Sequence, residues 1–99
     1  MLIVGASEGA RVLALARDVP GDGLVICIEG DRRAAARAAE AFRLEGLGAR
    51  VNVMIGDPAL FLRKVAGPFD LIAAPADLRA RLDGPLRAKL AAGGRILDL

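Results

Sequence analysis

The glycines of Gly5-Ala6-Ser7-Glu8-Gly9 are of a type and spacing that could hold a ligand. A short apolar run, Leu2-Ile3-Val4, precedes this segment directly, and a helical pattern follows it. A strand, a glycine turn and a helix together present backbone N–H groups at the helix N-terminus, where a nucleotide-like ligand can approach the main chain. The third glycine of the dinucleotide fingerprint is missing, so these glycines could equally serve only the geometry of a turn.

Other side chains that commonly do chemistry are scarce. The chain has no histidine, which removes the commonest general base and metal ligand and excludes a serine–histidine triad. Its single cysteine, Cys27, lies inside an apolar run. An intramolecular disulfide is therefore excluded, a metal cluster is not indicated, and we interpret Cys27 as an inert core residue.

Composition narrows the class of protein. The chain has 99 residues, which is the length of one domain, and 14 basic against 12 acidic residues give a formal net charge of +2. The basic residues are interleaved with acids, and aromatic residues make up only 3 %, so nucleic-acid binding is not indicated. Neither a membrane-spanning run nor a signal peptide is visible, so we expect a cytoplasmic protein.

The elements that must position the glycine turn alternate along the chain. The apolar patterns predict strands over residues 2–4, 24–28, 51–55, 69–74 and 95–99, and helices over 7–18, 32–45, 59–65, 78–82 and 86–91. Asp31, Asp57 and Asp77 are predicted helix caps, with Pro58 at a first helical position. This alternation predicts an α/β fold with a parallel sheet whose ligands bind at the carboxyl ends of the strands.

Five segments carry a family resemblance when they are taken in order. They are 2–9, 25–31, 53–58, 67–72 and 90–97. Together they resemble the class I S-adenosylmethionine-dependent methyltransferases, in particular the O-methyltransferase group that includes catechol and caffeoyl-CoA O-methyltransferase. The resemblance implies a Rossmann-like three-layer αβα sandwich with five parallel strands in the order 3-2-1-4-5. It also implies S-adenosylmethionine as the cofactor, bound at the carboxyl ends of strands 1, 2 and 3.

The resemblance also assigns cofactor-binding residues. Those expected to line the loop around the methionine part are Gly5, Ala6, Ser7 and Gly9. Glu29 is expected to accept hydrogen bonds from the ribose hydroxyls, with Gly30 leaving room for the ligand. Those expected beside the adenine are Gly56 and Asp57, and those near the sulfonium are Ala73 and Ala74. Glu29 could instead be a solvated acid at a strand end, and Asp57 only a helix cap.

Departures from the family pattern concern catalysis more than binding. Ile3 stands where many relatives carry an acid that helps fix the amino group of the cofactor. Pro75 stands where metal-dependent members place an aspartate, and Asp77 alone would make a poor site for a hard cation. Further ligands of the family come from an aspartate–asparagine pair just after strand 5, for which Asp98 could stand in only partly. We therefore predict no catalytic and no metal-binding residue in this chain.

The family also carries helices before strand 1 and two strands after strand 5, which lie outside these 99 residues. We accordingly expect one S-adenosylmethionine-binding domain over residues 1–99. Strand 5 is then expected to form a bare apolar edge, and such edges tend to pair with another chain. We expect a homodimer that pairs or packs near strand 5.

Two functions of different classes remain open. The first is a methyltransferase-like enzyme that acts on a small-molecule acceptor. The second is a catalytically inactive Rossmann-like module that binds a nucleoside weakly or serves in assembly. A short-chain dehydrogenase ranks last, because it needs a glycine where Arg11 stands and a tyrosine, and the chain has no tyrosine.

Overall fold

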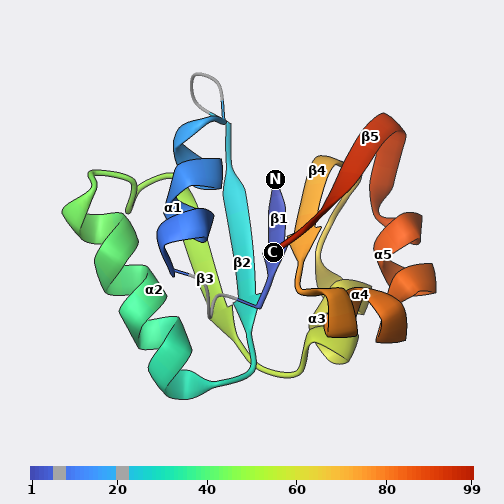
Figure 1. Ribbon diagram of the computed structural model, residues 1–99, viewed down its shortest axis with the longest axis horizontal. Helices are drawn as coiled ribbons and strands as arrows, with labels where there is room; N and C mark the ends of the chain where they lie inside the picture. The colour runs from blue at the N-terminus through green and yellow to red at the C-terminus, as the bar shows by residue number, and fades with distance from the viewer. Residues whose placement is uncertain (6–8, 20–22) are drawn as a thin grey trace.

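The computed structural model describes residues 1–5, 9–19 and 23–99, and strands and helices alternate along them (Figure 1). The strands are β1 (Leu2–Val4), β2 (Val25–Glu29), β3 (Val51–Ile55), β4 (Phe69–Ala74) and β5 (Leu90–Asp98). The helices are α1 (Gly9–Arg17), α2 (Arg32–Leu44), α3 (Pro58–Lys64), α4 (Ala76–Arg81) and α5 (Asp83–Ala88). Within the described ranges, no helix is long and apolar enough to cross a membrane.

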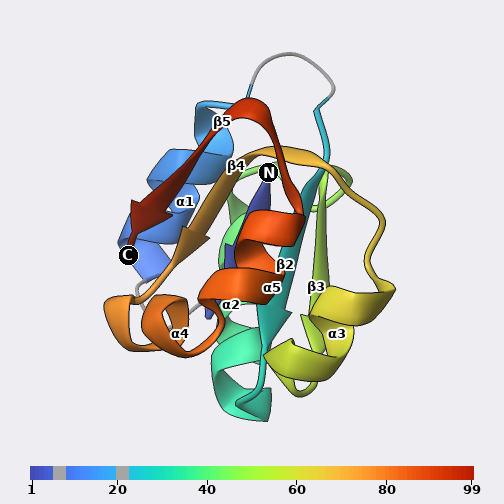
Figure 2. The same cartoon turned by 90° about the vertical axis from the view of Figure 1, so that its right-hand side faces the viewer.

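All neighbouring strands are parallel, and the sheet order is β3-β2-β1-β4-β5. This confirms the predicted order 3-2-1-4-5 and the three-layer Rossmann-like architecture. β3 and β5 are the edges of the sheet, whereas β2 lies inside it, as its unbroken apolar run predicts. Helices cover both faces, with α1 and α2 on one side and α3, α4 and α5 on the other (Figures 1 and 2).

The alternation of side chains along each strand divides the core into two parts. Leu2 and Val4 of β1 pack with Leu62 of α3 and Leu86 of α5 on one face. Ile3 points to the other face, where it joins a buried cluster with residues of α1 and α2. The three residues of β1 are 0 % exposed, so this short strand is the centre of the fold. Burial of both its faces explains why it is apolar throughout.

β5 differs from the prediction at its beginning. It starts at Leu90, five residues before the expected Arg95, and α5 ends at Ala88. Gly93 and Gly94 therefore lie within the strand, beside a register shift between Phe69 and Leu71 of β4. Gly93 has a φ of +79°, and a Cβ on Gly94 would lie 2.9 Å from the carbonyl oxygen of Asp70. The glycine pair thus allows an irregular strand instead of ending a helix.

Of the predicted helix caps Asp31 and Asp77, the structure confirms the first and contradicts the second. Asp31 caps α2, because its Oδ1 accepts the N–H of Arg33 at 2.8 Å and that of Ala34 at 3.4 Å. Asp77 is not a cap: it lies in the first turn of α4, and the N-cap position is held by Pro75, which makes no side-chain cap hydrogen bond. The prediction was wrong because α4 begins at Ala76, directly after β4, and not at Leu78.

Candidate functional site

The carboxyl ends of the strands lie together at the lower edge of the sheet in Figure 1. Val4 of β1 is paired with Ile28 of β2, and Ile28 in turn with Met54 of β3. On the other side of β1, Ala74 of β4 is paired with Asp98 of β5. Most of the predicted site residues follow these positions, so the fold brings them to one edge. This is the edge at which parallel α/β sheets bind their ligands.

Glu29 is a buried charged residue at this edge, with 9 % of its surface exposed. Its Oε1 accepts the backbone N–H of Asp31 at 3.0 Å, and Asp31 in turn caps α2. The carboxylate is thus held at the junction of β2 and α2. A carboxylate only accepts hydrogen bonds and has about four positions for them, so a ligand that offers hydroxyl donors suits it.

The loops after β2 and β3 lie against each other. The N–H of Gly56 donates to the carbonyl oxygen of Glu29 at 3.0 Å. A Cβ on Gly30 would lie 3.5 Å from the carbonyl oxygen of Gly56, which is ordinary contact. A Cβ on Gly56 would lie 2.0 Å from Cε2 of Phe61, so the ring or the loop would have to shift. The position of the Phe61 ring therefore favours glycine at 56, and nothing in the sequence pattern indicates this contact.

Asp57 follows this loop and caps α3, as predicted. Its Oδ1 accepts the N–H of Ala59 at 3.0 Å, and Pro58 occupies the first helical position. Its side chain is exposed at the same edge as Gly30 and Gly56. A contact between Asp57 and adenine stays a prediction, and the cap alone accounts for an aspartate at this position.

Gly5 joins the end of β1 to the segment after β4. Its φ is +86°, a conformation that favours glycine, and its N–H donates to the carbonyl oxygen of Ile28 at 2.8 Å. A Cβ at this position would lie 3.2 Å from both Pro75 and Leu78. Gly9 begins α1. The predicted cofactor residues Ala6 and Ser7 lie outside the described residues.

The β4 end of the edge is built from small side chains. Ala73 and Ala74 are both 0 % exposed, so their side chains form part of the core and do not reach the surface. Beyond them, Nη1 of Arg79 donates to Oδ1 of Asp98 at 2.7 Å. This exposed ion pair bridges α4 and the end of β5.

The described residues at this edge offer no evident binding site for a divalent cation. In residues 1–5, 9–19 and 23–99, no three side chains among histidine, cysteine, aspartate and glutamate gather into a group that could hold a metal. Asp98 is engaged by Arg79, and Pro75 has no ligating side chain. The described residues therefore do not fit the metal site of the metal-dependent family members, since a hard cation needs several oxygen ligands.

Cys27 lies two residues before Glu29 in β2 and is fully buried. Burial raises the pKa of its thiol to about 12, and the negative charge of Glu29 adds to this. The thiol is therefore neutral near pH 7, and it is a poor nucleophile. Its burial supports the interpretation of Cys27 as a core residue.

Three solved structures illustrate what the chain is similar to. A putative O-methyltransferase from Klebsiella pneumoniae is 27% identical with a TM-score of 0.85, covering 96% of this chain and 45% of its own. An O-methyltransferase from Bacillus cereus, solved in complex with S-adenosylhomocysteine (SAH), is 25% identical with a TM-score of 0.86. The match covers 96% of this chain and 46% of the Bacillus protein. The SAH-bound methyltransferase PaMTH1 from Podospora anserina is 29% identical with a TM-score of 0.75. The match covers 98% of this chain and 44% of PaMTH1.

The chain thus spans a little under half the length of these solved relatives. A search of curated proteins finds no match to it. The sequence profile of one family, described as O-methyltransferase, matches residues 1–83, which include every strand end described above except that of β5. The sheet order agrees with the one that the resemblance implies, and because the profile covers most of the chain, the chain belongs to the O-methyltransferase family.

Proposed function

We propose that residues 1–99 form an S-adenosylmethionine-binding domain that takes part in methyl transfer to a hydroxyl group of a small molecule. The observation that carries this proposal is Glu29, a buried carboxylate held at the carboxyl end of β2. Such a group is suited to the two ribose hydroxyls of a nucleoside. Family membership and the SAH-bound state of the Bacillus cereus and Podospora anserina relatives support the same cofactor.

In this proposal the chain's own residues bind and orient the donor. Glu29 accepts from the ribose, Gly30 leaves the main chain open to the ligand, and Gly56 and Asp57 border the adenine. Gly5, Ala6, Ser7 and Gly9 hold the methionine end. The main chain at Ala73 and Ala74 lies nearest the sulfonium, since their side chains are buried in the core. The sulfonium supplies an activated methyl group, whose in-line transfer depends mainly on how donor and acceptor are positioned.

A catalytically inactive binding module is the second candidate. It is favoured by the β4 end of the edge, where two buried alanines and the Arg79–Asp98 pair stand in the described structure. Neither alanine can act as a base, and Asp98 is engaged by a guanidinium. Binding without transfer of a methyl group is the outcome that distinguishes this candidate.

Calorimetric titration with S-adenosylhomocysteine tests the proposal. We expect saturable binding, and Glu29→Ala should raise Kd by about tenfold or more, since a hydrogen bond to a charged group contributes about 1.5–3 kcal/mol. Glu40→Ala, which removes an exposed carboxylate of α2, should leave Kd unchanged. Absence of binding at millimolar ligand, or equal Kd values for Glu29→Ala and the unmodified chain, would contradict it.

Three further expectations belong with this proposal. The chain pairs with a second copy near β5, which is an edge strand of the sheet and so has backbone groups available for pairing. Nucleic acid is not among its partners, and its compartment is the cytoplasm. The exclusion of nucleic acid rests on composition and the compartment on the apolar pattern of the sequence, and both stay predictions.

A further inference from the structure

The junction between β2 and α2 is short. Glu29 ends the strand and Arg32 begins the helix, so only Gly30 and Asp31 lie between them. Figure 1 shows β2 running into α2 at the carboxyl edge of the sheet. The geometry of this junction therefore decides where the Glu29 carboxylate lies.

Asp31 is fixed to the first turn of α2 by three hydrogen bonds. Its Oδ1 accepts the N–H of Arg33 at 2.8 Å and that of Ala34 at 3.4 Å, and its carbonyl oxygen accepts the N–H of Ala35 at 2.9 Å. Its backbone is extended, with a φ of −89° and a ψ of 119°, as is usual for an N-cap residue. The helix is itself anchored to the core by buried residues such as Phe42. The backbone of Asp31 is thus held in one orientation.

The same residue holds the Glu29 carboxylate. The N–H of Asp31 donates to Oε1 of Glu29 at 3.0 Å, in a partly buried hydrogen bond. The direction of this N–H follows from the backbone of Asp31, which the cap holds. The Asp31 side chain therefore acts on the carboxylate through two hydrogen bonds in series, from α2 to Asp31 and from Asp31 to Glu29. Contact between Asp31 and the ligand is not needed.

The charge of Asp31 is not needed for this action either. A cap requires a side-chain oxygen that accepts from the first turn, and asparagine serves as well as aspartate. A direct hydrogen bond from a ribose hydroxyl to Asp31 would instead be weakened by asparagine, because a charged acceptor makes the stronger bond. Asp31→Asn therefore distinguishes the two roles.

We propose that Asp31 is a positioning residue for ribose recognition: its cap of α2 orients the N–H that holds the Glu29 carboxylate, and so sets the preference for a ribose over a 2′-deoxyribose. The inference rests on the proposed function, in which Glu29 accepts from the ribose hydroxyls. A carboxylate that is not held must lose rotamer freedom when the ligand binds. Holding it beforehand removes this cost and strengthens the contact with the hydroxyls.

Calorimetry on the full chain tests the proposal by comparing Kd values for S-adenosylhomocysteine and its 2′-deoxy analogue. The unmodified chain should prefer the ribose form by about tenfold or more, since the missing hydrogen bond is to a charged group, and Glu29→Ala should abolish this preference. Asp31→Ala should reduce the preference by about threefold or more, because a misaligned hydrogen bond is weak. Asp31→Asn should keep it within about twofold, because the cap remains.

Ala39→Gly is the matched control for helix stability. Ala39 is exposed in the middle of α2, and glycine there costs about as much stability as the loss of a cap. This variant should unfold in urea about as easily as Asp31→Ala and yet keep the preference of the unmodified chain for ribose. An equal loss of preference in the two variants would overturn the positioning role, because the stability of α2 alone would then explain it.

The remaining outcomes separate this inference from the proposed function. No binding to the unmodified chain, or a preference for ribose that survives Glu29→Ala, would contradict both. A preference that is lost in Glu29→Ala and unchanged in Asp31→Ala would overturn the inference alone. So would an equal loss in Asp31→Asn and Asp31→Ala, because the charge of Asp31 and not its cap would then be responsible.

Discussion

The two halves of the carboxyl edge are built differently. At the β2–β3 half, Glu29 is buried, its carbonyl oxygen accepts from Gly56, and Asp57 caps the next helix. At the β4–β5 half, the wall is Ala73 and Ala74, followed by an exposed ion pair. Fixed polar groups are thus concentrated where the proposed cofactor binds. Among the described residues, the β4–β5 half has no buried charged side chain comparable to Glu29.

The largest expected effect is at Gly56, in the ordered half. Gly56→Ala places a Cβ 2.0 Å from Cε2 of Phe61, so the ring or the loop must move. We expect a loss of about 1–3 kcal/mol in the free energy of unfolding, as for other overpacked sites. Affinity for S-adenosylhomocysteine should fall as well, because the N–H of Gly56 is hydrogen-bonded to the carbonyl oxygen of Glu29. Urea unfolding and calorimetry measure the two effects.

Gly84→Ala is the matched control, since nothing lies within 4 Å of its Cβ position. Gly84 is in α5, where alanine is the better helix former, so stability should stay the same or rise by up to about 1 kcal/mol. Equal destabilisation by the two substitutions would contradict the contact between Gly56 and Phe61.

The next effect is a loss of stability at high pH that depends on the Cys27 thiol. The folded state keeps this thiol protonated up to about pH 12, whereas the unfolded chain releases the proton near its ordinary, lower pKa. The unfolded state therefore binds fewer protons in that window, and stability falls as pH rises toward 12. The slope is at most about 1.4 kcal/mol per pH unit.

Cys27→Ala removes this titration. We expect a shallower loss of stability above pH 9 in the variant than in the unmodified chain, whatever the variant's stability at pH 7. Unfolding curves at a series of pH values give the two slopes. Identical slopes would show that the thiol ionises equally readily in both states and so is not buried at β2.

A smaller effect separates two aspartates, one on each half. Asp57→Ala removes a helix cap and should lower stability by about 1 kcal/mol. Asp77→Ala removes no cap hydrogen bond and should change stability by less than about 0.5 kcal/mol. Thermal unfolding of both variants checks the difference. If Asp77→Ala destabilised the chain as much as Asp57→Ala, the assignment of a side-chain cap to α3 and of none to α4 would be contradicted.

The smallest effect is expected at Arg79. Its pair with Asp98 is exposed, and exposed pairs contribute about 0.2–1 kcal/mol. Arg79→Ala should therefore change stability by no more than this and leave the Kd for S-adenosylhomocysteine unchanged. Calorimetry of Arg79→Ala beside Glu29→Ala gives the comparison, and a large loss of affinity in Arg79→Ala would move the binding site toward β4 and β5.

Much of the fold could be predicted because local signals agreed. β2 is apolar at its first four positions since helices cover both its faces, and Asp57-Pro58 marks the start of α3 by simple capping chemistry. The beginning of β5 could not be predicted. Two adjacent glycines commonly end a helix, and only the close approach of Gly94 to the carbonyl of Asp70 shows that this pair lies within a strand.

The candidate site was predicted in outline from the family resemblance, and its supporting contacts were not. Phe61 is an ordinary core residue by its position in a helix, and nothing in the sequence places its ring against Gly56. Pro75 and Leu78 likewise meet Gly5 only because β1 and β4 are neighbours in the sheet. Such contacts join distant segments, so they depend on strand order and register.

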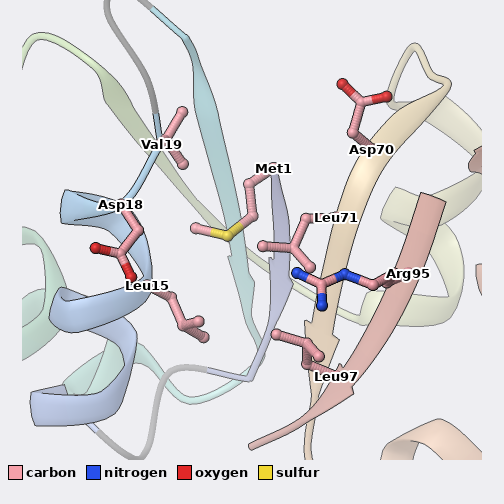
Figure 3. Close-up of a pocket in the computed structure, with 8 residues that line it drawn as sticks. All are labelled: Met1, Leu15, Asp18, Val19, Asp70, Leu71, Arg95 and Leu97. Carbon is pink, nitrogen blue, oxygen red and sulfur yellow. The ribbon is translucent and has the colours of Figure 1, made fainter.

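Mapping of bound S-adenosylhomocysteine on the backbone amides by two-dimensional NMR would locate the cofactor site directly. We expect the largest shift changes at Glu29, Gly30, Gly56 and Asp57. Little change is expected at Leu71 and Arg95, which line a pocket between α1 and the β4–β5 side of the sheet (Figure 3). Changes confined to that pocket, or no change at millimolar ligand, would contradict the assignment of the β2–β3 edge as the cofactor site.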